Sequence, residues 1–102
     1  MKALLIQPET RSIEEIDISG MDDIKSVIGY DTIESDPVGD DGDYLFFDEE
    51  CFLRGTEGRF QIDTLIPVSG KGVVVGFDGE AAFKDVAMSE QELSGRLKYF
   101  QT

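Results

Sequence analysis

Carboxylates are the side chains in this sequence whose type and spacing bear most directly on chemistry. Paired carboxylates act as general acid and base in enzymes, supply oxygen ligands to calcium, or form an anionic surface for a partner. The residues that raise these three options lie in the first half of the chain: Glu14, Glu15, Asp17, Asp40, Asp41, Asp43, Asp48, Glu49 and Glu50.

Catalysis and metal binding lack the residues that they require. The chain has no histidine, which removes the usual serine and cysteine triads and the common zinc sites. Acidic pairs are so frequent that none stands out as a general acid and base. Around Asp40, Asp41 and Asp43, the glycine and glutamate of an EF-hand loop are missing from their fixed positions. We therefore predict no enzyme activity, no metal site and no cofactor.

Two other motifs carry reactive groups, and each has a simpler explanation. Cys51 is the only cysteine, so an intrachain disulfide is excluded, and the acids that precede it disfavour a thiolate. We predict that Cys51 is a small buried side chain. Gly70-Lys71-Gly72 has the glycine and lysine of a phosphate loop without its spacing or its following Ser or Thr, which predicts a turn between strands.

The formal net charge of −13 comes from one part of the chain. Fourteen acidic residues and a single lysine lie between Glu14 and Glu50, whereas the segments on either side are nearly balanced. The basic residues are few and scattered, and the phosphate backbone of a nucleic acid would be repelled. We therefore predict that nucleic acid is not a partner.

The elements that must position these acids are predicted from apolar patterns. Strands are expected at 3–6, 12–18, 30–34, 44–47, 52–53, 60–62 and 73–77, the last as a central strand, and an acidic loop is expected at 36–43. Ser19 is predicted to cap a short helix that ends before Gly29. Ser89 is predicted to start a second helix with Leu93, Leu97 and Phe100 on one face. These elements predict one α+β domain over 1–102: a mainly antiparallel sheet with one or two short helices packed on it.

Rows of acids on such a sheet suggest an interaction surface. Alternate residues of a strand project from one face about 6.5 Å apart, so Glu15 and Asp17 form an ordered row of negative charge. Such a row imitates a phosphate backbone and steers a basic groove towards it. We expect the nine acids named above to contact a protein with a basic surface. The simpler alternative is that the acidity only keeps the domain soluble.

The first residues bear on localisation. Between Lys2 and Pro8 the apolar run is too short for a signal peptide or for a membrane span. The sequence therefore predicts a cytoplasmic protein with no membrane partner.

The order of several short motifs resembles a known family. The motifs are the stretch from Ala3 to Pro8, Ile16-Asp17-Ile18, Val27-Ile28-Gly29-Tyr30, Ile33-Glu34, Asp48-Glu49-Glu50 with Leu53 and Gly55, and Gly72-Val73-Val74-Val75-Gly76. Over residues 3–77 they resemble an uncharacterised family of small domains found in phages, plasmids and other mobile elements. The stretch 56–60 departs from the family pattern, which has proline and asparagine there.

The resemblance implies a setting and no catalytic residues. Small acidic proteins that block restriction or CRISPR machinery belong to such genomes, so we expect a DNA-mimic inhibitor of a host defence nuclease or CRISPR complex. The alternative is a structural or regulatory module, for example a homodimer, that binds another phage protein without mimicry. That module would use an exposed strand edge or the end of the chain around Tyr99 and Phe100.

Overall fold

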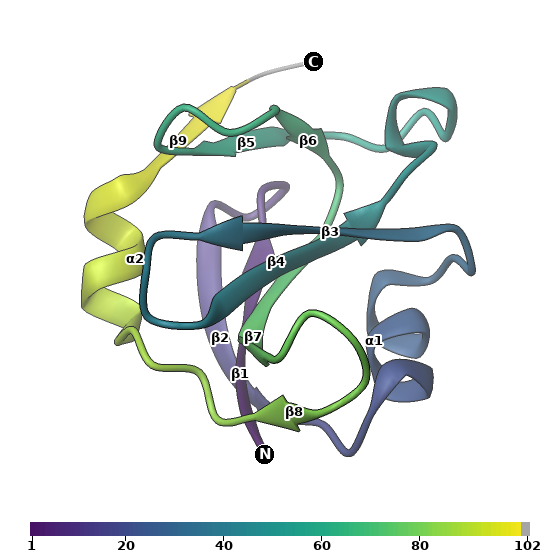
Figure 1. Ribbon diagram of the computed structural model, residues 1–102. Helices are drawn as coiled ribbons and strands as arrows, with labels where there is room; N and C mark the ends of the chain where they lie inside the picture. The colour runs from purple at the N-terminus through teal and green to yellow at the C-terminus, as the bar shows by residue number, and fades with distance from the viewer. Residues whose placement is uncertain (101–102) are drawn as a thin grey trace.

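Two antiparallel sheets and two short helices make up the computed structural model, which describes residues 1–100 (Figure 1). Sheet A has the order β2-β1-β7-β4-β3, with β8 paired to β7, and sheet B has the order β6-β5-β9. The elements are β1 (Lys2–Gln7), β2 (Ser12–Asp17), α1 (Met21–Ile28), β3 (Ile33–Val38), β4 (Asp43–Asp48), the 3-10 helix η1 (Cys51–Leu53), β5 (Arg59–Ile62), β6 (Val68–Ser69), β7 (Gly72–Phe77), β8 (Phe83–Lys84), α2 (Glu90–Arg96) and β9 (Leu97–Phe100). The predicted α+β fold is confirmed.

Sheet A is the middle layer, and its three central strands β1, β7 and β4 are buried on both faces. In β1, Leu4 and Ile6 enter one core while Ala3 and Leu5 enter the other. α1 covers one face, and sheet B together with α2 covers the opposite face (Figure 1). This arrangement explains why β1, β4 and β7 are continuous apolar runs, because a strand covered on both sides has no polar face. The predicted central position of β7 is confirmed.

α1 is an amphipathic helix whose apolar side rests on sheet A. Ile24 and Ile28 are buried, and Gly29 ends the helix in the left-handed conformation at φ 92° with its N–H donating to the Lys25 carbonyl oxygen at 2.7 Å. Glycine accepts this φ without a steric cost. Ser19 is not the capping residue, since Gly20 holds that position. Instead the Ser19 hydroxyl and N–H both donate to the Asp23 carboxylate, which lowers the pKa of Asp23.

The hairpin formed by β3 and β4 differs from the expected strand at 30–34 and acidic loop at 36–43. β3 begins later and continues through Pro37 to Val38, so the loop shrinks to four residues, 39–42. Pro37 is tolerated because β3 is an edge strand, and the backbone on its outer side donates no hydrogen bonds to a neighbouring strand. Glu34 and Asp36 therefore lie on a strand and share one face of it.

Leu97 to Phe100 form a strand where a helix was expected. α2 begins at Ser89, whose hydroxyl accepts the Glu92 N–H at 3.1 Å as predicted, but it ends at Arg96. Leu97 and Tyr99 then pack on the core as part of β9, which pairs with β5. The helical spacing of Leu97 and Phe100 was misleading because pairing with β5 decides the conformation. The strand expected at 52–53 is the 3-10 helix η1, and neither helix among residues 1–100 is long and apolar enough to cross a membrane.

Candidate functional site

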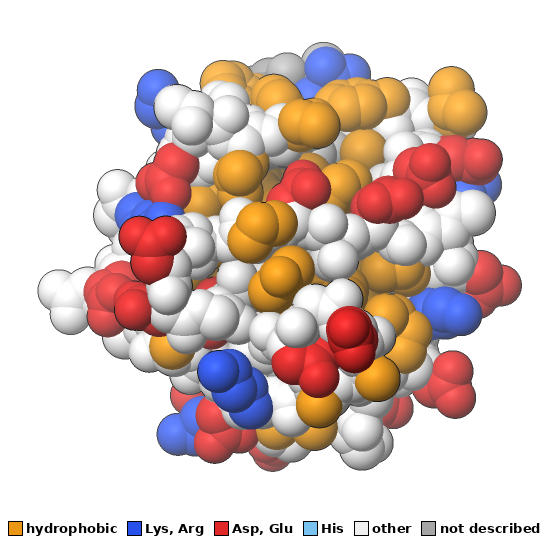
Figure 2. Space-filling view, viewed as in Figure 1, with side chains coloured by type: hydrophobic (Ala, Val, Ile, Leu, Met, Phe, Trp, Pro, Cys, Tyr) orange, Lys and Arg blue, Asp and Glu red, His pale blue; other side chains and the backbone are white. Residues whose placement is uncertain are grey.

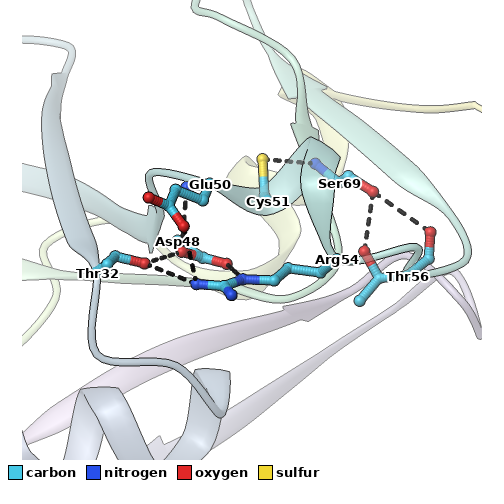
Figure 3. A network of polar contacts seen from close by, with 7 residues as sticks. All are labelled: Thr32, Asp48, Glu50, Cys51, Arg54, Thr56 and Ser69. Carbon is cyan, nitrogen blue, oxygen red and sulfur yellow. Dashed lines mark hydrogen bonds and ion pairs between the residues drawn. The ribbon is translucent and has the colours of Figure 1, made fainter.

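A polar network joins the end of β4 to the residues that follow η1 (Figure 3). Asp48, the last residue of β4, is 3% exposed. Its carboxylate accepts the Arg54 Nε–H at 2.9 Å, the Glu50 N–H at 3.1 Å and the Thr32 hydroxyl. Arg54 also donates from Nη2 to Thr32 Oγ1 at 3.1 Å, and its guanidinium carbon lies 4.3 Å from the centroid of the Tyr30 ring. The Asp48 carboxylate thus connects the segment before β3, the end of β4 and the residue that follows η1.

The network keeps Asp48 ionised. Burial raises the pKa of the Asp48 carboxyl, but the hydrogen bonds from Arg54, Thr32 and the Glu50 N–H outweigh it, and the pKa is held below its usual value. The same bond to Asp48 raises the pKa of Arg54. Both groups are therefore charged across the physiological range, and the pair is a fixed structural element rather than a proton donor.

The lowered pKa of Asp48 predicts how its contribution to stability depends on pH. A carboxyl with a depressed folded pKa stabilises above its unfolded pKa of about 3.9 and loses that contribution as the pH falls through the folded pKa. We expect the gap in unfolding free energy between wild type and Asp48→Asn to be constant from neutral pH down to about pH 5 and to narrow below about pH 4. Urea titrations at several pH values measure it, and a gap unchanged at low pH would contradict the assignment.

Contacts from β6 and from β5 hold η1 in place. The Ser69 N–H donates to Cys51 Sγ at 3.4 Å, and the Ser69 hydroxyl lies 2.9 Å from that of Thr56 (Figure 3). The Arg59 guanidinium carbon lies 4.8 Å from the centroid of the Phe52 ring. The prediction that Cys51 is buried is confirmed.

A cleft of about 360 Å³ lies beside the network. Its walls come from the turn after β1, from the end of α1, from the segment around η1 and from the turn before β7, and the lining includes Tyr30, Cys51, Arg54 and Lys71. No histidine is present to activate the Cys51 thiol. Within residues 1–100, no three Cys, Asp or Glu side chains gather into a metal-binding group.

Seven of the nine predicted contact residues are exposed: Glu14, Glu15, Asp17, Asp40, Asp41, Glu49 and Glu50. Asp43 and Asp48 are not. Asp43 is 1% exposed, and its two oxygens accept the backbone N–H groups of Ala87 and Met88 at 2.8 and 3.0 Å. Asp43 and Asp48 begin and end the buried strand β4, so both carboxylates are structural and neither is available to a partner.

The exposed acids do not form one patch. β2 and β3 are opposite edges of sheet A, so the β2 acids lie away from the acids of the β3–β4 hairpin. Of the β2 acids, Glu14 accepts the Gln7 Nε2–H at 3.1 Å, and Asp17 lies opposite Lys2 in the register of β1 and β2.

The second group is called here the hairpin edge and comprises Glu34, Asp36, Asp40, Asp41, Glu49 and Glu50. In the described part of the chain only Glu50 of these has a cation within ion-pair distance, Arg54 at 3.5 Å. Figure 2 shows acidic side chains near both ends of β3. Sequence reasoning placed Asp36 in a loop and did not select Glu34. The local sequence from Ile33 to Asp36 has no apolar alternation that marks a strand, and in the structure Glu34 is exposed whereas Asp36 is half-buried.

The fold and the site define a small α+β domain that presents an acidic strand edge next to a firmly held 3-10 turn. No family model, curated protein or solved structure matches the chain. Function therefore has to be inferred from the exposed charges and from the network described above.

Proposed function

We propose that this domain is an interaction protein that binds the basic surface of a nucleic-acid-binding protein through its hairpin edge. One observation supports this most strongly: five of the six acids there have no hydrogen bond or ion pair from their side chains within residues 1–100. Unneutralised carboxylates held on a strand repel one another, and a basic partner relieves that repulsion.

The spacing of these acids supports mimicry of a phosphate backbone. Glu34 and Asp36 lie on one face of β3, about 6.5 Å apart for alternate strand residues. One strand of duplex DNA carries a charge about every 3.4 Å along its axis, so this spacing corresponds to about two phosphates. Because the chain is strongly negative, it is attracted over long range to a positive groove, and the attraction weakens as salt screens it.

The proposed binding mode suggests a biological role in a phage or another mobile element. A cytoplasmic protein of a phage or another mobile element that occupies the basic groove of a host defence nuclease or CRISPR complex would act as a DNA mimic. The resemblance to mobile-element domains favours this role by analogy. The proposed role is inhibitory and needs neither an active site nor a cofactor.

A second candidate is an interaction module without mimicry, for example a homodimer. It is favoured by the large exposed apolar side chains, which all lie after residue 50: Phe52, Leu53, Ile66 and Phe100. Figure 2 shows apolar side chains gathered over sheet B at the top of the molecule. An apolar surface of this kind marks protein contacts. Light scattering on the purified chain tests the homodimer, and a monomer would contradict that form of the second candidate.

The hairpin edge and the β2 acids predict different results on charge reversal. Asp40→Lys/Asp41→Lys is expected to reduce capture of a basic nucleic-acid-binding protein from host lysate by about tenfold or more at low salt. Glu15→Lys/Asp17→Lys is the matched control, with the same change of charge at the opposite edge, and should retain capture within about threefold. Asp43 is left intact because it is buried.

The same capture experiment is repeated with washes at low and at high salt concentration. Protein captured by wild type should be lost at high salt, where exposed charges are screened. Equal losses for the two double variants, or capture that is insensitive to salt, would contradict the assignment to the hairpin edge.

A further inference from the structure

We infer that η1 is an apolar anchor that inserts into the partner beside the hairpin edge. Leu53 is 81% exposed and Phe52 is 50% exposed, and they are consecutive residues of one 3-10 turn. The inference rests on the proposed function, because it assigns to the same partner an apolar pocket next to the basic groove.

Several contacts hold the backbone of η1 and the Phe52 ring in place. The Leu53 N–H donates to the Glu50 carbonyl oxygen at 2.9 Å, and the Asp48–Arg54 pair closes the turn from below. The Arg59 guanidinium packs on the Phe52 ring, and Cys51, the first residue of the turn, is buried. A fixed turn loses little conformational entropy on binding, which makes an exposed Leu53 an effective contact.

The charge of the residues next to η1 indicates what kind of partner segment η1 contacts. Glu49 and Glu50 directly precede η1 and belong to the hairpin edge, so the apolar anchor borders the acidic surface at the Ile33–Asp48 end of the hairpin. Interfaces commonly have an apolar centre with a charged rim. The matching partner segment therefore carries an apolar pocket flanked by Lys or Arg side chains.

Ile66 provides the comparison within the same molecule. It is 64% exposed, in the loop between β5 and β6, and the acid nearest to it in sequence, Asp63, is paired with Arg96. The acid nearest to Ile66 in sequence is thus neutralised, whereas Glu49, shortly before η1, has no ion pair among the described residues. Leu53→Ser and Ile66→Ser remove comparable apolar surface and leave the charge unchanged, so they form a matched pair.

A random peptide library selected on the wild-type domain at low salt tests the anchor. We expect enriched peptides to combine basic with apolar residues, and to bind Leu53→Ser about tenfold or more weakly by fluorescence anisotropy. Binding to Ile66→Ser should stay within about threefold. Circular dichroism checks that both variants are folded.

The outcomes separate the anchor from the acidic surface. Peptides that bind Leu53→Ser and wild type equally, or a selection that enriches no basic and apolar peptides, would overturn the anchor. Sensitivity to Leu53→Ser together with indifference to salt and to Asp40→Asn/Asp41→Asn would retain the anchor and contradict the proposed acidic contact. Weaker peptide binding both by Leu53→Ser and by Asp40→Asn/Asp41→Asn supports the anchor and the acidic contact together.

Discussion

Asp43→Asn is expected to lower the free energy of unfolding by about 3 kcal/mol. The carboxylate is buried at the start of β4 and accepts two backbone N–H groups, those of Ala87 and Met88, from the segment that leads into α2. Asparagine keeps the shape but has only one acceptor oxygen, so one of these N–H groups is left without a partner in a buried position. Chemical denaturation followed by circular dichroism measures the loss.

Asp41→Asn is the matched control two residues away. Asp41 is exposed in the hairpin loop, so the same chemical change should alter the unfolding free energy by no more than about 0.5 kcal/mol. Equal effects of the two substitutions would show that the hydrogen bonds from Ala87 and Met88 to Asp43 do not stabilise the fold. The comparison also separates folding from binding, because only Asp41 belongs to the hairpin edge.

Asp48→Ala is expected to destabilise the fold by about 3 kcal/mol, at the lower end of the range for breaking a buried ion pair. The lower end is appropriate because the Arg54 side chain is 28% exposed, and water partly solvates the cation left behind. Denaturation of both single variants and of Asp48→Ala/Arg54→Ala gives a coupling energy, which should be about 1 to 2 kcal/mol.

The same substitution should loosen η1, since the network closes that turn. Hydrogen exchange is expected to speed up at the Leu53 and Arg54 N–H groups, which donate to Glu50 and Cys51. Glu49→Ala is the control, because this exposed side chain has no partner among the described residues. A coupling energy near zero between Asp48 and Arg54 would contradict the claim that this network holds η1 in place.

Much of the fold was predictable because apolar runs mark buried strands. The run from Val73 to Phe77 and the alternation after Ser12 identified β7 and β2, and Gly29 marked the end of α1. The prediction was wrong where tertiary pairing overrides local pattern. Leu97 to Phe100 has helical spacing, but pairing with β5 makes it a strand.

The candidate site was only partly accessible from the sequence. An excess of acids indicates an anionic surface, but the residue type does not reveal which carboxylates are buried, because burial depends on contacts far along the chain. Asp43 is bonded to residues more than forty positions away. Phe52 and Leu53 looked like a weak strand, and only the structure shows that both side chains are exposed on a 3-10 turn.

Competition with nucleic acid tests the central claim most directly. The basic protein captured by the wild-type domain is immobilised and titrated with the domain in the presence of increasing amounts of the duplex DNA or guide RNA that this protein binds. Mimicry through the hairpin edge predicts that nucleic acid displaces the domain competitively, and that Asp40→Lys/Asp41→Lys no longer competes. A ternary complex of partner, nucleic acid and domain, with the affinity of the domain unchanged, would contradict it.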